Sequence, residues 1–323
     1  MRAIIITRNG GPEVLELRDQ PEPRIKAGQL LVAVEAVGVN YRDVYEREGG
    51  GAYTNTPPIV AGIEGAGVVV AVAVSDGVSE FSEGDRVAWD AAPGSYAGLV
   101  AVDAARAVPI PDGVSSELAA AALLQGLTAH YLCTSTYRVQ PGDDVLVHAA
   151  AGGVGLLLTQ MVKLRGGRVI ATTSTEDKAE LARQAGADET TSYAGFAGRV
   201  REITDGAGVA VVYDGVGATT FEGSLAALGQ RGYLVLYGQA SGPVEPLDPE
   251  RLRHGSQYLT RPTLPSYTAT REELLRRAGD VFGWIAEGRL DVRIGARYRL
   301  EDAREAHENL QGRYTTGKLL LIP

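Results

Sequence analysis

A run of small residues, Gly152-Gly153-Val154-Gly155, separates the apolar segment 145–148 from an apolar helical pattern. Glycines at a strand-to-helix turn let the backbone approach a pyrophosphate, which rests on the free N–H groups and partial positive charge of the helix N-terminus. Ala150 replaces the first glycine of the usual G-x-G-x-x-G pattern, a mild departure. We predict that Gly152, Gly153 and Val154 bind a dinucleotide diphosphate. The alternative is a turn that is glycine-rich only for close packing.

The residues about 20 positions after this loop predict which dinucleotide is bound. An NAD site usually places Asp or Glu there to bind both ribose hydroxyls. This chain has Thr173 and Ser174, with Lys178 four residues further on. Hydroxyls and an ammonium group bind a 2′-phosphate, which a carboxylate would repel. We therefore predict NADPH, bound through Ser174 and Lys178, with Tyr193 over the same phosphate or the adenine. The alternative is that Lys178 is an ordinary solvated helix charge.

Charge and cysteine content narrow the possible partners. The formal net charge is −9, which disfavours nucleic acid and anionic membranes as partners. Cys133 is the only cysteine, so the chain has no intramolecular disulfide and no thiolate cluster for zinc. We expect a cytoplasmic protein without signal peptide or membrane span. The histidines show no metal-ligand spacing, and His148 is predicted to be a hydrogen-bonded core residue.

Strands alternate with helices in the middle of the chain and surround the glycine loop. The predicted helices are 116–131, 156–164, 178–185 and 221–228, and the predicted strands are 145–148, 168–172, 209–213 and 233–237. Alternation of this kind forms right-handed βαβ units and a parallel, doubly wound sheet.

The two ends of the chain have a different pattern. Residues 1–110 are rich in short strands, such as 32–37 and 67–74, the latter ending at Ser75-Asp76-Gly77. After a capping box at 270–273, we predict a helix with an apolar face, a strand near 292–294, a helix near 303–310 and a strand at 318–322. These last elements are too few for a domain of their own, so we expect them to complete the first one.

Several segments resemble the quinone oxidoreductase branch, which includes zeta-crystallin, of the medium-chain dehydrogenase/reductase superfamily. They are residues 37–43 (VGVNYRD), 62–67 (GIEGAG), 125–129 (QGLTA), 148–155 (HAAAGGVG), 260–264 (TRPTL) and 316–320 (TGKLL). The resemblance implies an α/β protein with a GroES-like β-rich catalytic domain, residues 1–120 completed by 265–323. A Rossmann domain of doubly wound parallel sheet, residues 121–264, would be inserted in it, with the cofactor in the cleft between them.

The positions that hold catalytic zinc in alcohol dehydrogenases of this superfamily correspond to Asn40, Ile63 and Gln125. Isoleucine has no lone pair, and carboxamides are poor zinc ligands. The four-cysteine structural zinc loop is also absent from the sequence. The resemblance therefore implies a zinc-independent enzyme that donates hydride to an acceptor that is already electrophilic.

The resemblance also assigns site residues. Asn40, Tyr41 and Asp43 would line the nicotinamide side of the cleft, and an Asn inside the apolar end of a strand needs partners if it is buried. From its place after a glycine run at 49–51, Tyr53 is predicted to gate the pocket or donate a proton; the alternative is an exposed loop aromatic. Tyr41 is the other candidate donor, and ordinary aromatic packing is the alternative for Tyr41 and Tyr237. The remaining cofactor contacts would come from Thr128, Tyr131, Tyr237, Ser241, Tyr267 and Lys318.

The sequence leaves three functions open. The first is NADPH-dependent hydride transfer to a quinone, and the second is reduction of an α,β-unsaturated carbonyl compound on the same scaffold. The third is a non-catalytic NADPH-binding protein with a structural or sensing role. We also expect a homodimer, paired through the strand 233–237 as the edge of the Rossmann sheet.

Overall fold

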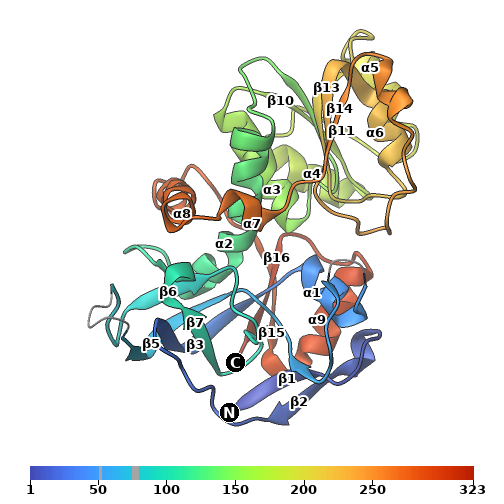
Figure 1. Ribbon diagram of the computed structural model, residues 1–323. Helices are drawn as coiled ribbons and strands as arrows, with labels where there is room; N and C mark the ends of the chain where they lie inside the picture. The colour runs from blue at the N-terminus through green and yellow to red at the C-terminus, as the bar shows by residue number, and fades with distance from the viewer. Residues whose placement is uncertain (51–52, 75–79) are drawn as a thin grey trace. The chain divides into compact units, whose positions relative to one another are not determined.

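The computed structural model describes residues 1–50, 53–74 and 80–323, which form two compact units (Figure 1). The first unit is Met1–Leu124 together with Thr270–Pro323, and the second is Gln125–Ala269. The sequence placed these divisions four or five residues earlier, after residues 120 and 264. The turn predicted at 75–77 and part of the glycine run at 49–51 lie outside the described residues.

The first unit is built on two β-sheets. A three-stranded sheet has the order β2 (Leu15–Asp19), β1 (Arg2–Ile6) and β4 (Ile59–Val60). A seven-stranded sheet has the order β15 (Ile294–Arg299), β16 (Lys318–Ile322), β3 (Gln29–Val39), β5 (Gly65–Ala73), β6 (Arg86–Trp89) and β8 (Val108–Pro109), with β7 (Leu99–Asp103) paired to β3. Its helices are α1 (Tyr41–Glu48), α8 (Arg271–Ala286) and α9 (Ala303–Gln311).

The end of the chain completes this unit. Strand β16 pairs antiparallel with β3, so that Leu319 lies opposite Val39 and Leu320 opposite Gly38. The strand expected near 292–294 instead runs from Ile294 to Arg299. It lies at the edge of the sheet and alternates half-buried with exposed residues, so no apolar run marks it in the sequence.

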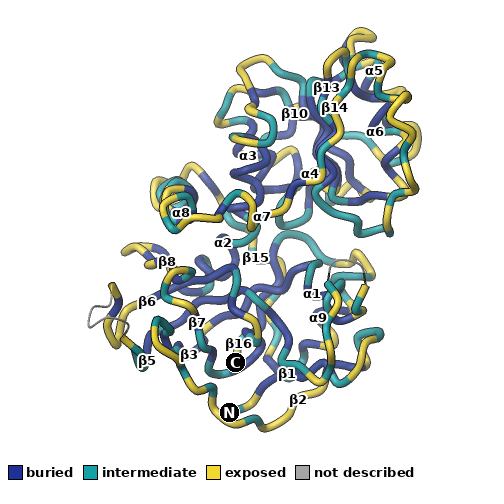
Figure 2. Tube along the Cα trace, in the orientation of Figure 1, coloured by how far each residue is buried: buried dark blue, intermediate teal, exposed yellow. Residues whose placement is uncertain are grey.

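The second unit contains one six-stranded parallel sheet, whose strands are largely buried while the outer helix surfaces are exposed (Figure 2). Its order is β11 (Glu189–Thr191), β10 (Arg168–Thr172), β9 (Asp144–Val147), β12 (Val209–Asp214), β13 (Leu228–Leu236) and β14 (Tyr258–Thr260). Its helices are α3 (Gly153–Leu164), α4 (Glu176–Gln184), α5 (Phe196–Ile203), α6 (Phe221–Ala227) and α7 (Leu264–Tyr267), and α2 (Ser116–Tyr131) leads into it from the first unit.

The prediction that residues 233–237 form the sheet edge is wrong. Strand β14 hydrogen-bonds outside β13, with Tyr258 opposite Tyr233, and is itself the edge strand. Three partly exposed residues give no buried apolar run, so the sequence pattern did not indicate β14. No helix among the described residues has the length and apolarity needed to cross a membrane.

Candidate functional site

The glycine loop lies at the carboxyl end of β9 and opens α3. Gly152 is the N-cap of α3 and has no side chain that could cap the amides of the first turn. A Cβ on Gly155 would lie 2.4 Å from the carbonyl oxygen of Ala149. The loop is therefore packed closely against its own backbone. A compact loop of this kind lets a dinucleotide diphosphate come close to the amides at the start of the helix.

The residues predicted to select the cofactor follow β10. Ser174 is exposed, and Lys178 is half-buried in the first turn of α4, where its backbone N–H donates to the Thr175 hydroxyl (3.3 Å). Glu176 in the same turn is paired with Arg183. The position at the end of β10 thus carries hydroxyl groups, as the predicted 2′-phosphate site requires.

Tyr193 contacts the glycine loop directly. Its hydroxyl accepts a hydrogen bond from the backbone N–H of Ala149 (3.1 Å). Ala149 itself has a left-handed backbone conformation, with a φ of 51°. The Tyr193 ring is also stacked near the His148 ring, with centroids 6.1 Å apart. Tyr193 therefore belongs to the same local surface as the loop.

A buried hydrogen-bond network ties together the strand ends beneath this loop. The His148 imidazole lies 2.8 Å from Thr172 Oγ1 and 2.9 Å from Ser224 Oγ, and Ser224 donates to Asp214 Oδ2 (2.9 Å). Because Ser224 gives its proton to the carboxylate, it accepts from His148 Nε2–H, and Thr172 donates to Nδ1. The prediction of a hydrogen-bonded core histidine is confirmed. The network joins the carboxyl ends of β9, β10 and β12.

Asp214, which sequence reasoning missed, also fixes the turn after β12. It accepts hydrogen bonds from the backbone N–H groups of Val216 (2.8 Å) and Gly217 (3.0 Å) and from the Thr220 hydroxyl. The Ser241 hydroxyl donates to the Val216 carbonyl (2.8 Å). Ser241, which follows β13, therefore holds the turn after β12 in place.

The other predicted contacts of this unit are aromatic or lie on α2. The Tyr131 and Tyr267 rings are stacked, with centroids 4.3 Å apart and planes 7° apart, and Thr136 donates to the Tyr267 hydroxyl (3.0 Å). Thr128 is buried on α2, and Tyr237 follows β13 with its ring against Gly215. Tyr267 thus packs within the second unit rather than with Lys318, which lies in the first.

In the first unit, Asn40 is buried at the junction of β3 and α1. Its Nδ2 donates to Glu64 Oε2 (2.7 Å), and Lys318 Nζ donates to Asn40 Oδ1 (2.8 Å) and to Glu64 Oε2 (2.6 Å). The Leu124 backbone N–H donates to the other Glu64 oxygen (2.7 Å). The ion pair therefore fixes the orientation of the Asn40 carboxamide. Glu64 was missed, although a carboxylate inside the apolar segment 62–67 was a usable signal.

The donor set at the position of a catalytic zinc does not fit that metal. The Asn40 carboxamide oxygen already faces an ammonium group, and Ile63 offers no donor atom. Within the described ranges there is also no group of three or more His, Cys, Asp or Glu residues that could hold a metal ion.

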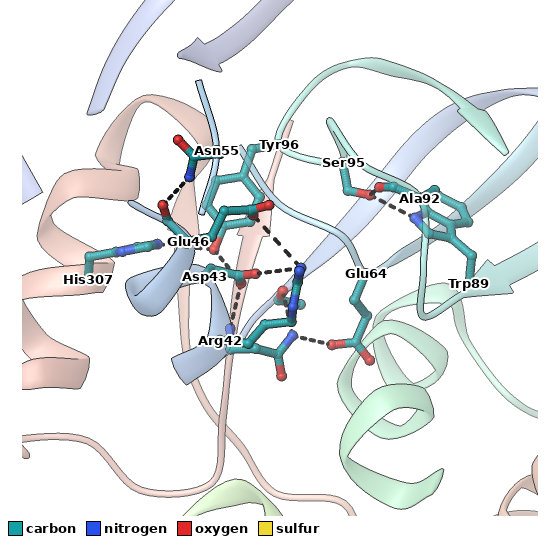
Figure 3. Close-up of polar contacts among 12 residues, drawn as sticks. Arg42, Asp43, Glu46, Asn55, Glu64, Trp89, Ala92, Ser95, Tyr96 and His307 are labelled. Carbon is teal, nitrogen blue, oxygen red and sulfur yellow. Dashed lines mark hydrogen bonds and ion pairs between the residues drawn. The ribbon is translucent and has the colours of Figure 1, made fainter. Parts of the chain in front are cut away.

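Asp43, in the first turn of α1, is the centre of a second buried network (Figure 3). Its Oδ2 accepts hydrogen bonds from the Asn40 backbone N–H (2.9 Å) and the Tyr96 hydroxyl (3.1 Å). Its Oδ1 is buried without a hydrogen-bond partner among the residues described. Burial raises the pKa of Asp43 to about 6, opposed by the charge of Arg42.

The network continues to α9. Tyr96 Oη lies 3.1 Å from His307 Nε2, and Arg47 Nη1 lies 3.0 Å from His307 Nδ1. Arginine can only donate, so Nδ1 is the acceptor and Nε2–H donates to Tyr96, which in turn donates to Asp43. Burial, and secondarily the charge of Arg47, lower the pKa of His307 to about 3. Each hydrogen bond in the series Arg47–His307–Tyr96–Asp43 is therefore donated in the direction of Asp43.

Three tyrosines and Arg42 form an aromatic cluster on and beside α1. The Tyr41 and Tyr45 ring centroids are 5.3 Å apart, and those of Tyr45 and Tyr53 are 5.4 Å apart. The Arg42 guanidinium carbon lies 5.4 Å from the Tyr53 ring centroid. Burial raises the pKa of Tyr41, which opposes its deprotonation. The structure thus brings three of the predicted catalytic residues, Tyr41, Asp43 and Tyr53, to one helix end.

Two of the buried histidines, His148 and His307, predict acid sensitivity. Burial lowers the pKa of His148 to about 4 and that of His307 to about 3. As the pH falls, these histidines therefore bind protons in the unfolded protein before they do so in the folded protein. The free energy of unfolding is highest above about pH 6.5 and decreases as the pH falls toward 4 for His148 and toward 3 for His307. At pH 5 the loss is roughly 2 kcal/mol per histidine. Asp43, whose pKa is raised to about 6, has the opposite effect on the free energy of unfolding, because it binds its proton first in the folded protein. It therefore partly offsets the loss.

We expect His307→Gln, which cannot gain charge, to shrink the loss of first-unit stability between pH 7 and pH 5 by roughly 2 kcal/mol. Urea unfolding followed by tryptophan fluorescence measures this, because both tryptophans, Trp89 and Trp284, lie in the first unit. His254→Gln, at an exposed position, is the control. An unchanged pH dependence in the His307 variant would contradict the assignment.

Comparisons with known proteins agree with this architecture. The alcohol dehydrogenase GroES-like domain family matches residues 26–112, and the zinc-binding dehydrogenase family matches residues 153–278. The chain is 44% identical to a quinone oxidoreductase of Pseudomonas aeruginosa (97% of each chain) and 37% identical to a 2-haloacrylate reductase of a Burkholderia species (99% of this chain, 98% of the relative).

Among solved structures, the chain is similar to Escherichia coli quinone oxidoreductase complexed with NADPH. The TM-score is 0.96 at 39% identity, and both chains are covered completely. The predicted fold class, a GroES-like domain with a Rossmann domain, is confirmed. With this similarity over nearly its whole length, the chain belongs to the quinone oxidoreductase branch of the medium-chain dehydrogenase/reductase superfamily.

Proposed function

We propose that this protein is an NADPH-dependent oxidoreductase that reduces quinones by hydride transfer without zinc. The observation that carries the proposal is the glycine loop at the start of α3, where Gly155 packs against the Ala149 carbonyl and the N-cap is a glycine. The P. aeruginosa relative is named a quinone oxidoreductase, and the E. coli structure is an NADPH complex. Both names support the same cofactor and acceptor for this chain.

The residues of the second unit would bind and orient the cofactor. The amides of Gly152, Gly153 and Val154 would hold the diphosphate, and Ser174, Lys178 and Tyr193 would surround the 2′-phosphate. Thr128, Tyr131, Tyr237, Ser241 and Tyr267 would contact the nicotinamide half. When bound, NADPH supplies the hydride, and the protein supplies position and exclusion of water.

The residues of the first unit would form the acceptor side. Asn40 would face the nicotinamide, with its carboxamide orientation fixed by Glu64 and Lys318. Lys318 would thus act toward the cofactor through Asn40. Tyr41 and Tyr53 would line the acceptor pocket, and the buried Asp43 would support them by fixing the start of α1 through the Asn40 N–H. Tyr41 or Tyr53 would donate a proton if the acceptor requires one from the protein.

A second candidate activity is reduction of an α,β-unsaturated carbonyl compound. The relative named 2-haloacrylate reductase, at 37% identity, favours it because that name describes a conjugated substrate. Stopped-flow oxidation of NADPH with quinones, enones and aldehydes separates the two: we expect rapid turnover with quinones and slow turnover with enones. Tight NADPH binding without turnover on any acceptor would instead indicate a non-catalytic NADPH-binding protein.

The cofactor assignment makes a prediction for Lys178→Ala. Loss of an ammonium group from the 2′-phosphate should lower the ratio of kcat/KM for NADPH to that for NADH roughly 10-fold or more. Steady-state kinetics with both cofactors measures this ratio. Lys163→Ala is the control, because Lys163 is a half-buried lysine of the same unit whose ammonium group is paired with Asp188 (2.7 Å). An unchanged ratio in Lys178→Ala would remove Lys178 from the phosphate site.

We further propose a cytoplasmic homodimer. The edge strand β14 leaves backbone groups available for pairing with a second copy, and Tyr258 and Leu259 on it are exposed. Leu259→Lys places a charge on this exposed edge and should shift the protein to monomers. Light scattering at several concentrations tests this, and a wild-type protein that is monomeric throughout would refute it.

A further inference from the structure

Arg42 is a largely buried arginine whose guanidinium group is held by ion pairs and not by direct hydrogen bonds. Its contacts with Asp43 Oδ1 (3.9 Å) and Glu46 Oε2 (3.8 Å) are ion pairs beyond hydrogen-bond distance. Its side chain is only 27% exposed. By contrast, Arg18, which is 49% exposed, makes a direct hydrogen bond of 2.7 Å to Glu16.

A guanidinium group that is three-quarters buried normally has its N–H donors paired. Arg47, five residues further along α1, shows the usual situation: it is fully buried and donates to Gly10, His307 and Gln311. Arg42 makes no hydrogen bond to any residue in the described part of the chain. Its donors are therefore available to an oxygen atom that belongs to a ligand.

The surroundings of Arg42 indicate which ligand this is. The guanidinium lies over the Tyr53 ring, and Tyr45 and Tyr41 continue the aromatic surface. Asp43 and Glu46 hold the guanidinium from the side of α1, as Figure 3 shows. One guanidinium group beside two carboxyl groups gives no excess of positive charge, so this cluster does not bind anions of every kind. The arrangement suits a planar ring whose oxygen gains negative charge during reaction.

We propose that Arg42 donates hydrogen bonds to the carbonyl oxygen of the acceptor and stabilises the oxyanion formed when the acceptor is reduced. The proposal deepens the proposed quinone reduction and rests on it. Addition of hydride to a quinone transfers two electrons from NADPH, which becomes NADP⁺, and leaves a hydroquinone monoanion. A proton from solvent then completes the hydroquinone. Arg42 would act while the negative charge is on oxygen.

The first test measures binding of an aromatic oxyanion without turnover. The probe is 4-nitrophenol, titrated spectrophotometrically in the presence of NADP⁺-saturated protein. We expect wild-type protein to bind the phenolate in preference to the phenol, and Arg42→Met to bind the phenolate roughly 10-fold more weakly. Arg42→Lys should keep part of the effect. Arg18→Met, at a bonded exposed arginine, should behave as wild type.

Glu46→Gln provides a prediction of opposite sign. Removing this carboxylate leaves Arg42 less neutralised, so the phenolate should bind more tightly than to wild type. Because removing a carboxylate also weakens its direct repulsion of the phenolate, the proposal further requires that most of this increase is lost in the Arg42→Met/Glu46→Gln double variant. Equal phenolate binding by wild type and Arg42→Met, or no preference of wild type for the phenolate, would overturn the proposal. Arg42→Gln replaces Arg42→Met in the single and the double variant if Arg42→Met fails to fold.

The second test separates this proposal from the proposed function. With quinone acceptors, Arg42→Met should lower kcat roughly 10-fold and leave the Kd for NADPH, measured by fluorescence, unchanged. If wild type reduces no quinone but the phenolate effects are present, the proposed function fails and the oxyanion site stands. If wild type reduces quinones and Arg42→Met does so equally well, the Arg42 proposal fails and the function stands.

Discussion

Replacing Lys318 by Met should lower the free energy of unfolding of the first unit by about 3–5 kcal/mol. Lys318 and Glu64 are both almost completely buried, with their charged atoms 2.6 Å apart. Removing the ammonium group leaves the Glu64 carboxylate in the interior with the Asn40 amide and the Leu124 N–H as its partners in the described part of the chain. Urea unfolding followed by tryptophan fluorescence reports on this unit alone.

The double variant Glu64→Gln/Lys318→Met tests whether the cost comes from the uncompensated charge. The glutamine oxygen still accepts from the Leu124 N–H, and the Asn40 carboxamide can rotate to meet the glutamine amide. We expect the double variant to recover most of the lost stability. A Lys318→Met variant that loses less than about 1 kcal/mol would show that the ion pair is not buried as described.

Replacing Gly155 by Ala should weaken NADPH binding at least roughly 10-fold, because the glycine loop must move. The new Cβ would lie 2.4 Å from the Ala149 carbonyl oxygen and 2.7 Å from the Ala150 Cα, and neither backbone atom can shift without displacing the loop. Fluorescence titration with NADPH measures the change. Stability of the second unit should fall by about 1–3 kcal/mol as well.

Two other glycines of the same unit serve as matched controls. A Cβ on Gly198, on the exposed side of α5, meets nothing within 4 Å, so Gly198→Ala should raise stability by about 0.4–1 kcal/mol and leave binding unchanged. Gly153→Ala first meets the flexible end of Gln125, so its effect should be smaller than that of Gly155→Ala. NADPH binding by Gly155→Ala at wild-type strength would contradict the geometry of the loop.

Elements with a strong local pattern were predictable from the sequence. The Ala/Leu-rich helix α2 (Ser116–Tyr131) and the final strand β16 (Lys318–Ile322) have the predicted bounds. Helix α1 was missed because its polar and aromatic residues follow the apolar end of β3 directly. The Asn40–Asp43 pair, in which Asp43 accepts the Asn40 backbone N–H, was the available signal for its start.

By itself the sequence determined the βαβ alternation, the glycine loop and the absence of zinc-ligand side chains at positions 40, 63 and 125. These features depend on residue type and on neighbours within a few positions. Only the tertiary structure decided the buried pairs. The register of β16 on β3 brings Lys318 to Asn40 and Glu64 across more than 250 residues, and packing of α9 brings His307 to Tyr96 and Arg47. Such contacts arise from sheet register and helix packing, which no local spacing in the chain encodes.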